Sequence, residues 1–151
     1  MSGHDIRIEL ASDPRLLASV RALVRGYVSG FGVPRHRVED IVLAIDEACS
    51  NAIRHSYEGK TDGRLCVDFR SDADGLEFEV CDDGIPARPE HVEQRALAVP
   101  ERAALTPGGL GVQFIHRIFD EVEFHPGPAR GNRVVMRMRL SGHEGSDPER
   151  D

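Results

Sequence analysis

Apolar residues recur along the chain with two different periods, and the change of period separates helices from strands. Apolar side chains at three- and four-residue spacing predict one helix over residues 14–30 and a second over residues 34–56. A third helix is expected to begin near Gly109. Alternation of apolar and polar residues predicts strands that contain residues 6–10, 65–69, 76–80, 122–124 and 134–140.

The order of these elements predicts the fold class. Short polar turns at residues 71–75 and 126–131 join successive strands, and such turns favour antiparallel pairing. The helices come before the first strand pair and between the two pairs, so we expect them to cover one face of a single sheet. We therefore predict an α+β domain, a two-layer α/β sandwich with a mixed, mostly antiparallel sheet.

One internal segment and the C-terminus lack this periodicity. From Asp83 to Gly109, prolines interrupt the chain and no apolar stripe is sustained. Loops of this length usually cover a site, bind a ligand or are disordered. Residues 142–151 have no large apolar side chain and are expected to be a disordered tail. The predicted organisation is one domain over residues 1–141, followed by this tail.

Composition narrows the class of protein. The chain has 151 residues, 40% hydrophobic and 30% charged, which is typical of one globular domain. Its net charge of −7 argues against a nucleic-acid coat or a polybasic membrane binder. The longest apolar run, residues 41–45, is far too short to span a membrane. The cysteines lack CxxC spacing, which argues against a zinc site or disulfide framework and favours a reducing cytoplasm.

The second predicted helix carries a carboxylate and an amide one turn apart. Glu47 and Asn51 are four residues apart, so they lie on one face of the helix among small residues that let a ligand approach. An amide oxygen is a hard ligand for Mg²⁺, and a carboxylate can accept a proton. By itself, such a pair is more often a solvated helix face.

Two further motifs combine glycine with helix or strand ends. Asp82 and Gly84 follow an apolar strand, where a carboxylate could accept a hydrogen bond from the amine of adenine; a plain acidic turn is the alternative. Gly108, Gly109 and Gly111 lead into the third helix, where backbone N–H groups and the helix dipole favour phosphate; a flexible hinge is the alternative. The second motif is neither a Walker A loop nor a Rossmann fingerprint, because no Lys-Ser/Thr follows it and no strand directly precedes it.

In this order, the motifs resemble the boxes of the GHKL ATP-binding superfamily, most closely the anti-sigma factor serine kinases of the RsbW and SpoIIAB type. Residues 39–57, with their Asp-Glu-Ala…Asn-Ala…His-x-Tyr form, are similar to the N box. Residues 80–84 resemble the G1 box, and residues 108–124 resemble the G2 box with its following helix and strand. Residues 131–140 resemble the terminal strand, so the resemblance covers about residues 5–140.

The resemblance implies a role for each position. Asn51 would ligate Mg²⁺ on the nucleotide phosphates, and Glu47 would be the general base toward the substrate hydroxyl. Asp82 would hydrogen-bond the adenine amino group, and residues 85–107 would form the ATP lid. The other positions expected at the nucleotide are Arg54, His55, Gly84, Gly108, Gly109, Leu110, Gly111 and Asn132. A purely structural role is the alternative for His55.

The chain departs from the family pattern at two positions. Where the G1 box has its second glycine, this chain has Pro86. Where the terminal strand often has threonine near the adenine, this chain has Asn132, which can still hydrogen-bond. These departures bear on lid closure and on phosphoryl transfer more than on ATP binding.

The function that the resemblance implies is an ATP- and Mg²⁺-dependent protein serine/threonine kinase that also acts as an anti-sigma factor. Its expected partners are a sigma factor and a small STAS-type anti-sigma antagonist, whose serine or threonine accepts the phosphoryl group. We expect a cytoplasmic homodimer that binds neither nucleic acid nor membrane directly. The alternative is a nucleotide-binding regulatory module that holds a partner without kinase activity. A sensor histidine kinase is disfavoured, because too few residues precede the second helix for a phospho-accepting hairpin.

Overall fold

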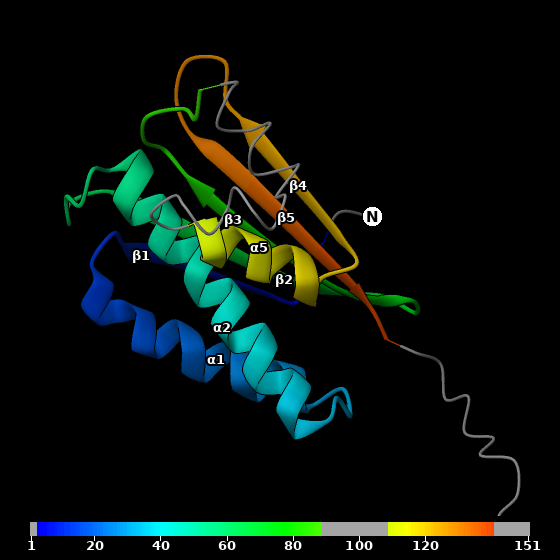
Figure 1. The fold of residues 1–151 in the computed structure, drawn as a ribbon. Coiled ribbons are helices and arrows are strands. Elements are labelled where there is room, and N and C mark those ends of the chain that lie inside the picture. Colours follow the sequence, from blue (N-terminus) through cyan, green and yellow to red (C-terminus); the bar gives the residue numbers. More distant parts are fainter. Residues whose placement is uncertain (1–2, 89–108, 141–151) are drawn as a thin grey trace, which may run out of the picture.

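Within residues 3–88 and 109–140, which the computed structural model describes, five strands form one sheet and three α-helices lie on one of its faces (Figure 1). The arrangement confirms the predicted two-layer α+β sandwich. The strands are β1 (Ile6–Ala11), β2 (Arg64–Ser71), β3 (Gly75–Asp82), β4 (Glu121–Pro126) and β5 (Asn132–Arg139). The helical elements are η1 (Pro14–Leu16), α1 (Leu17–Ser29), α2 (Arg35–Asn51), η2 (Ala52–Ser56) and α5 (Gly109–Ile118).

The strand order determines which motifs become neighbours. In the described part of the chain the order is β1-β2-β3-β5-β4, and each neighbouring pair is antiparallel. The last strand therefore lies between β3 and β4, and its register places Asn132 opposite Asp82. Two residues that are 50 positions apart in sequence thus meet at one end of the sheet.

The core lies between the helices and the inner face of the sheet. Alternate residues of the strands point into it, and Phe69 and Phe78 are completely buried there. Tyr27 of α1 packs on both rings, with centroids 5.1 Å from Phe69 and 6.0 Å from Phe78. Burial of these side chains against α1 and α2 fixes the layer that supports the site.

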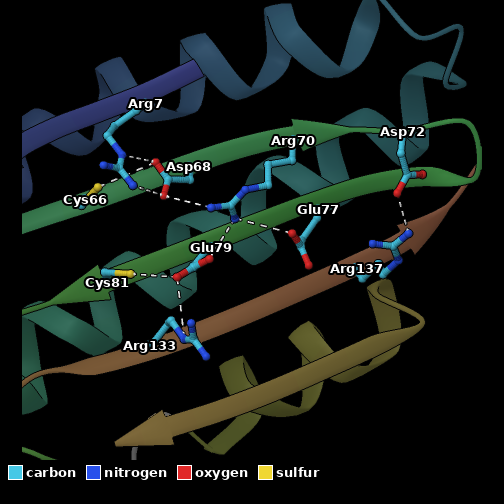
Figure 2. A network of polar contacts seen from close by, with 10 residues as sticks. All are labelled: Arg7, Cys66, Asp68, Arg70, Asp72, Glu77, Glu79, Cys81, Arg133 and Arg137. Carbon is cyan, nitrogen blue, oxygen red and sulfur yellow. Dashed lines mark hydrogen bonds and ion pairs between the residues drawn. The ribbon is translucent and has the colours of Figure 1, made fainter. Parts of the chain in front are cut away.

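The outer face of the sheet carries charged side chains that pair with one another (Figure 2). The carboxylate of Asp68 is only 2% exposed, and Arg7 donates two hydrogen bonds to it at 2.7 and 2.9 Å. Arg70 bridges from Asp68 to Glu79 of the next strand, at 3.6 and 2.8 Å. These arginines provide the buried carboxylate of Asp68 with charged partners, without which its burial would cost free energy.

Element boundaries differ from the sequence pattern at the start of the first helix, where residues 14–16 form the 3-10 turn η1, and at the end of the second helix. The predicted helix over residues 34–56 is α-helical only to Asn51 and continues as a π-helix through η2. The N–H of Tyr57 donates to the carbonyl of Ala52 at 3.3 Å, five residues back. Residues 89–107 of the expected lid, Gly108 and the tail over residues 142–151 lie outside the described residues. None of the described helices combines the length and apolar character needed to cross a bilayer.

Candidate functional site

The predicted site residues gather where α2 and η2 meet the ends of β3 and β5. A small cavity of about 20 Å³ lies at this junction. Its lining brings together Asn51, Asp82 and Asn132, which come from three separate parts of the sequence. The remaining lining residues are Ala48, Ala52, Ser56, Val80, Phe124 and Val134. The cavity has room for about one water molecule, so in this arrangement of side chains it is too small for a purine ring.

The carboxylate of Asp82 is held by donors on three sides. Ser56 Oγ donates to Oδ2 at 2.7 Å, and the backbone N–H of Gly84 donates to Oδ1 at 3.0 Å. The amide nitrogen of Asn132 lies 3.2 and 3.4 Å from the two oxygens. An ionised carboxylate has about four acceptor positions. The hydrogen bonds from Ser56 and Gly84 occupy one acceptor position on each oxygen, and the longer contacts from Asn132, whose amide also donates to Ile85 and Ser56, fill the remaining positions only weakly.

The two departures from the family pattern lie against each other. Asn132 Nδ2 donates to the carbonyl of Ile85 at 2.9 Å, and the N–H of Ala87 donates to Asn132 Oδ1 at 2.7 Å. Between these groups is Pro86, which has no N–H to pair. One side-chain amide thus binds the backbone on both sides of the proline, as a neighbouring strand would.

Close backbone contact joins this turn to η2. A Cβ on Gly84 would lie 2.3 Å from the carbonyl oxygen of Ser56, so only glycine fits at this position. The N–H of Ile85 donates to the same carbonyl at 2.9 Å. Tyr57 also supports the turn, because its hydroxyl accepts from the N–H of Asp83 at 2.7 Å and donates to the carbonyl of Arg64 at 2.6 Å.

Glu47 and Asn51 share one cationic partner. Arg54 Nη2 donates to Glu47 Oε1 at 2.8 Å and to Asn51 Oδ1 at 2.6 Å. Asn51 is 7% exposed, whereas the side chains of Glu47 and Arg54 are 26% and 50% exposed. The predicted i, i+4 pair therefore lies on one face of α2 as expected, with the guanidinium of Arg54 joined to both members.

The start of α5 lies against Glu47. The helix begins at Gly109, as predicted, and has no acidic residue of its own in the first turn. A Cβ on Gly111 would lie only 2.0 Å from Glu47 Oε1, so a side chain at this position would displace the carboxylate of Glu47. A carboxylate beside the N-terminal turn of a helix is electrostatically favourable. The second glycine motif is therefore next to the N-box pair in space, although about 60 residues separate them.

The side-chain oxygen of Asn51 suits a hard cation whose other ligands would come from water and substrate phosphates. Among the described residues there is no group of three or more His, Cys, Asp or Glu side chains that could hold a metal. Mg²⁺ is commonly bound by one or two protein oxygens, with water and substrate phosphates completing its shell. One buried amide oxygen is consistent with that chemistry.

The nearby thiols are not candidates for reaction. Burial raises the pKa of Cys49 to about 12. Burial also raises the pKa of Cys81 to about 12, and a hydrogen bond from its thiol to Glu79 acts in the same direction. Protonated, buried thiols are poor nucleophiles and poor metal ligands.

His55 is exposed on η2.

Sequence reasoning missed one member of the site. Ser56 contacts both Asp82 and Asn132 through its hydroxyl, at 2.7 and 3.0 Å. In the sequence, Ser56 is the central residue of the His-x-Tyr motif, and this position is the signal that could have indicated its place in the site. Ser56 is buried because the turn that follows β3 packs against it, through Gly84 and the N–H of Ile85.

Comparisons with known proteins bear on the family and the fold of the chain. Residues 10–138 match the family model described as the histidine kinase-like ATPase domain. The chain is 28% identical over 149 residues to the serine-protein kinase RsbW of Bacillus velezensis, covering 91% of this chain and 86% of the relative. It is 30% identical over 142 residues to RsbW of Listeria innocua, covering 91% and 89%. The crystal structure of the SiaB-SiaC complex from Pseudomonas aeruginosa shares the fold, with a TM-score of 0.65 at 14% identity over 89% of each chain.

Proposed function

The chain belongs to the histidine kinase-like ATPase domain family, and from this premise we propose that it is an ATP-dependent protein serine/threonine kinase that acts as an anti-sigma regulatory factor. It phosphorylates a serine or threonine of an antagonist protein, and it sequesters a sigma factor. The observation that carries the proposal is that Asn51 and Asp82 line one cavity while Gly111 of α5 lies against Glu47. The relatives named serine-protein kinase support the reaction type.

Asp82 is the proposed adenine-binding residue. Its two short hydrogen bonds occupy one acceptor position on each oxygen, which leaves acceptor capacity for the exocyclic amine of adenine. Gly84 permits the close approach of this turn to η2. Asn132 borders the same cavity and is proposed to contribute to the base-binding side of the site.

The start of α5 is the proposed phosphate-binding element. Its first backbone N–H groups have no partner within the helix, and the helix dipole favours an anion there. Gly108, Gly109, Leu110 and Gly111 are the proposed phosphate-side positions, and residues 85–107 are the proposed lid of a domain that covers residues 1–141. Arg54 and His55 follow Asn51 on η2 and are proposed to border the phosphates.

Asn51 is the proposed metal-binding residue. Its amide oxygen would hold Mg²⁺, which supplies charge neutralisation to the transferred phosphoryl group when bound. Glu47 is the proposed general base, which accepts the proton of the incoming serine or threonine hydroxyl. Its carboxylate is partly exposed, so an incoming side chain can reach it. Because phosphoryl transfer depends mainly on positioning and charge, these residues suffice without a covalent intermediate on the protein.

The proposed partners are proteins. A STAS-type antagonist would present the acceptor hydroxyl, a sigma factor would be held by the same chain, and the working unit would be a homodimer in the cytoplasm. The net charge of −7 supports protein partners over direct binding to nucleic acid.

A second candidate function is a nucleotide-binding module that holds a partner without phosphoryl transfer. The observation that favours it is the ion pair between Glu47 and Arg54, which engages the proposed base.

One experiment separates the two functions. The chain is incubated with γ-labelled ATP, Mg²⁺ and the candidate antagonist, and intact-protein mass spectrometry detects one added phosphoryl group. The kinase proposal predicts modification of a serine or threonine on the antagonist. Tight ATP binding with no transfer to any antagonist would favour the module.

A further inference from the structure

The side chain of Arg54 satisfies both of the residues proposed to act on the phosphoryl group. A single nitrogen, Nη2, donates to Glu47 Oε1 at 2.8 Å and to Asn51 Oδ1 at 2.6 Å. Both distances are those of charge-assisted hydrogen bonds. The positively charged guanidinium is therefore shared between the carboxylate of Glu47 and the amide oxygen of Asn51.

Arg54 and a divalent cation compete for the amide oxygen of Asn51, because both are positively charged. A metal bound to Asn51 Oδ1 would be placed within a few ångströms of the guanidinium, and two cations at that distance repel each other strongly in a partly buried site. Asn51 is 7% exposed, so water screens this repulsion poorly. Binding of the metal at this oxygen therefore disfavours the hydrogen bond from Arg54.

Arg54 is able to leave this position. It lies on η2, the π-helical turn after α2, and half of its side-chain surface is exposed to water. The ion pair with Glu47 is therefore of the partly exposed kind, which contributes modestly to stability. When Arg54 leaves Asn51, it also breaks its hydrogen bond to Glu47. Binding of a metal to the oxygen of Asn51 and loss of the ion pair at Glu47 are therefore linked through the side chain of Arg54.

We propose that Arg54 is a positioning residue that occupies the metal-binding oxygen of Asn51 when no metal nucleotide is bound, and that its displacement by Mg²⁺ releases Glu47 to act as the base. This inference rests on the proposed function, because it takes Asn51 as the metal ligand. It differs from a role as a phosphate contact alone, since a phosphate contact would not be exchanged against the metal.

The test compares nucleotide affinity with and without metal. Dissociation constants for a non-hydrolysable ATP analogue are measured by calorimetry in Mg²⁺ and in EDTA, and the constant in EDTA divided by the constant in Mg²⁺ gives the metal dependence. For Arg54→Ala we expect this ratio to rise about fivefold over the parent, because the competing cation is gone. Arg54→Lys keeps a cation within reach of both groups and should return the ratio toward the parent value.

A matched control removes the same charge elsewhere. Arg35 is exposed at the start of α2, and Arg35→Ala should leave the ratio unchanged. If Arg54→Ala weakens the affinity equally with and without Mg²⁺, Arg54 is only a phosphate contact and the proposal is overturned. A ratio that falls would also overturn it, because the metal and Arg54 would then act together.

Failure of the proposed function gives a different result. A parent chain whose affinity for the analogue does not depend on Mg²⁺ would remove the metal site itself, and both proposals would fall. Binding of Mn²⁺ to the chain with the analogue, followed by its electron paramagnetic resonance signal, gives a second readout that requires no catalysis. The Arg54→Ala variant should bind Mn²⁺ more tightly than the parent, and equal binding would contradict the exchange.

Discussion

The amide of Asn132 should determine how firmly the chain is held on both sides of Pro86. Replacement by alanine removes the donor to the carbonyl of Ile85 and the acceptor for the N–H of Ala87, at 2.9 and 2.7 Å. It also removes a donor that lies 3.2 Å from Asp82. A net hydrogen bond contributes about 0.5–1.5 kcal/mol. Because Asn132 is only partly buried, water can replace some of these bonds.

The expected effect of Asn132→Ala is a loss of about 1–2 kcal/mol in the free energy of unfolding. For a chain of this size that corresponds to a fall in Tm of about 2–8 °C. The more direct signal is local. Hydrogen exchange at the amide of Ala87 should become about tenfold faster, since its acceptor is lost. Urea unfolding measures the first quantity, and exchange followed by NMR measures the second.

Asn132→Asp is the matched control for this prediction. It keeps an oxygen acceptor for the N–H of Ala87 but loses the donor to Ile85 and places a second carboxylate beside Asp82. Protection of the Ala87 amide should therefore survive while the free energy of unfolding falls further. If exchange at Ala87 is the same in the parent and in Asn132→Ala, the amide does not hold this segment and the reasoning is refuted.

Three further predictions follow from the contacts described above. Gly84→Ala would place a Cβ 2.3 Å from the backbone carbonyl oxygen of Ser56 and should cost about 1–3 kcal/mol of stability; Gly26→Ala on open α1 surface should cost nothing in a parallel thermal melt, and equal behaviour of the two variants would refute the contact. Hydrogen bonds from arginine lower the pKa of Asp68 from 3.8, so its stabilisation is present above the unfolded pKa and is lost as the pH falls through the lower folded value. Unfolding of Asp68→Asn should therefore depend less on pH below about 4 than unfolding of the parent, and identical pH profiles would contradict this. Asp82→Asn should weaken ATP binding by about tenfold or more, because it replaces part of an acceptor-only group by a donor; unchanged affinity by calorimetry would exclude adenine recognition by Asp82.

Local pattern predicted the elements of this fold well because each element carries its own signal. Alternation identified β2 and β3, and helical spacing identified α1 and α2. The start of α5 at Gly109 followed from the glycine motif. These features depend on residues that are close in sequence, so no knowledge of the tertiary structure is needed to recognise them.

The composition of the site depended on information that no local pattern contains. Asn132 reaches Asp82 only because β5 is inserted between β3 and β4, and strand order is a property of the whole sheet. Ser56 joins them because the last residue of η2 lies beside the end of β3, where its hydroxyl donates to Asp82. The link from Arg54 to both Glu47 and Asn51 depends on side-chain rotamers that spacing alone does not determine.

Replacement of Glu47 by glutamine tests the central claim most directly. Glutamine keeps the size and hydrogen-bonding reach of the side chain but cannot accept the proton of a hydroxyl. Transfer from ATP to the antagonist is measured on the parent and on Glu47→Gln, with ATP affinity and thermal stability checked on the same preparations. The account predicts that the rate of transfer falls by about 10²–10⁴-fold while ATP binding is retained. Equal rates of transfer in the two proteins would contradict it.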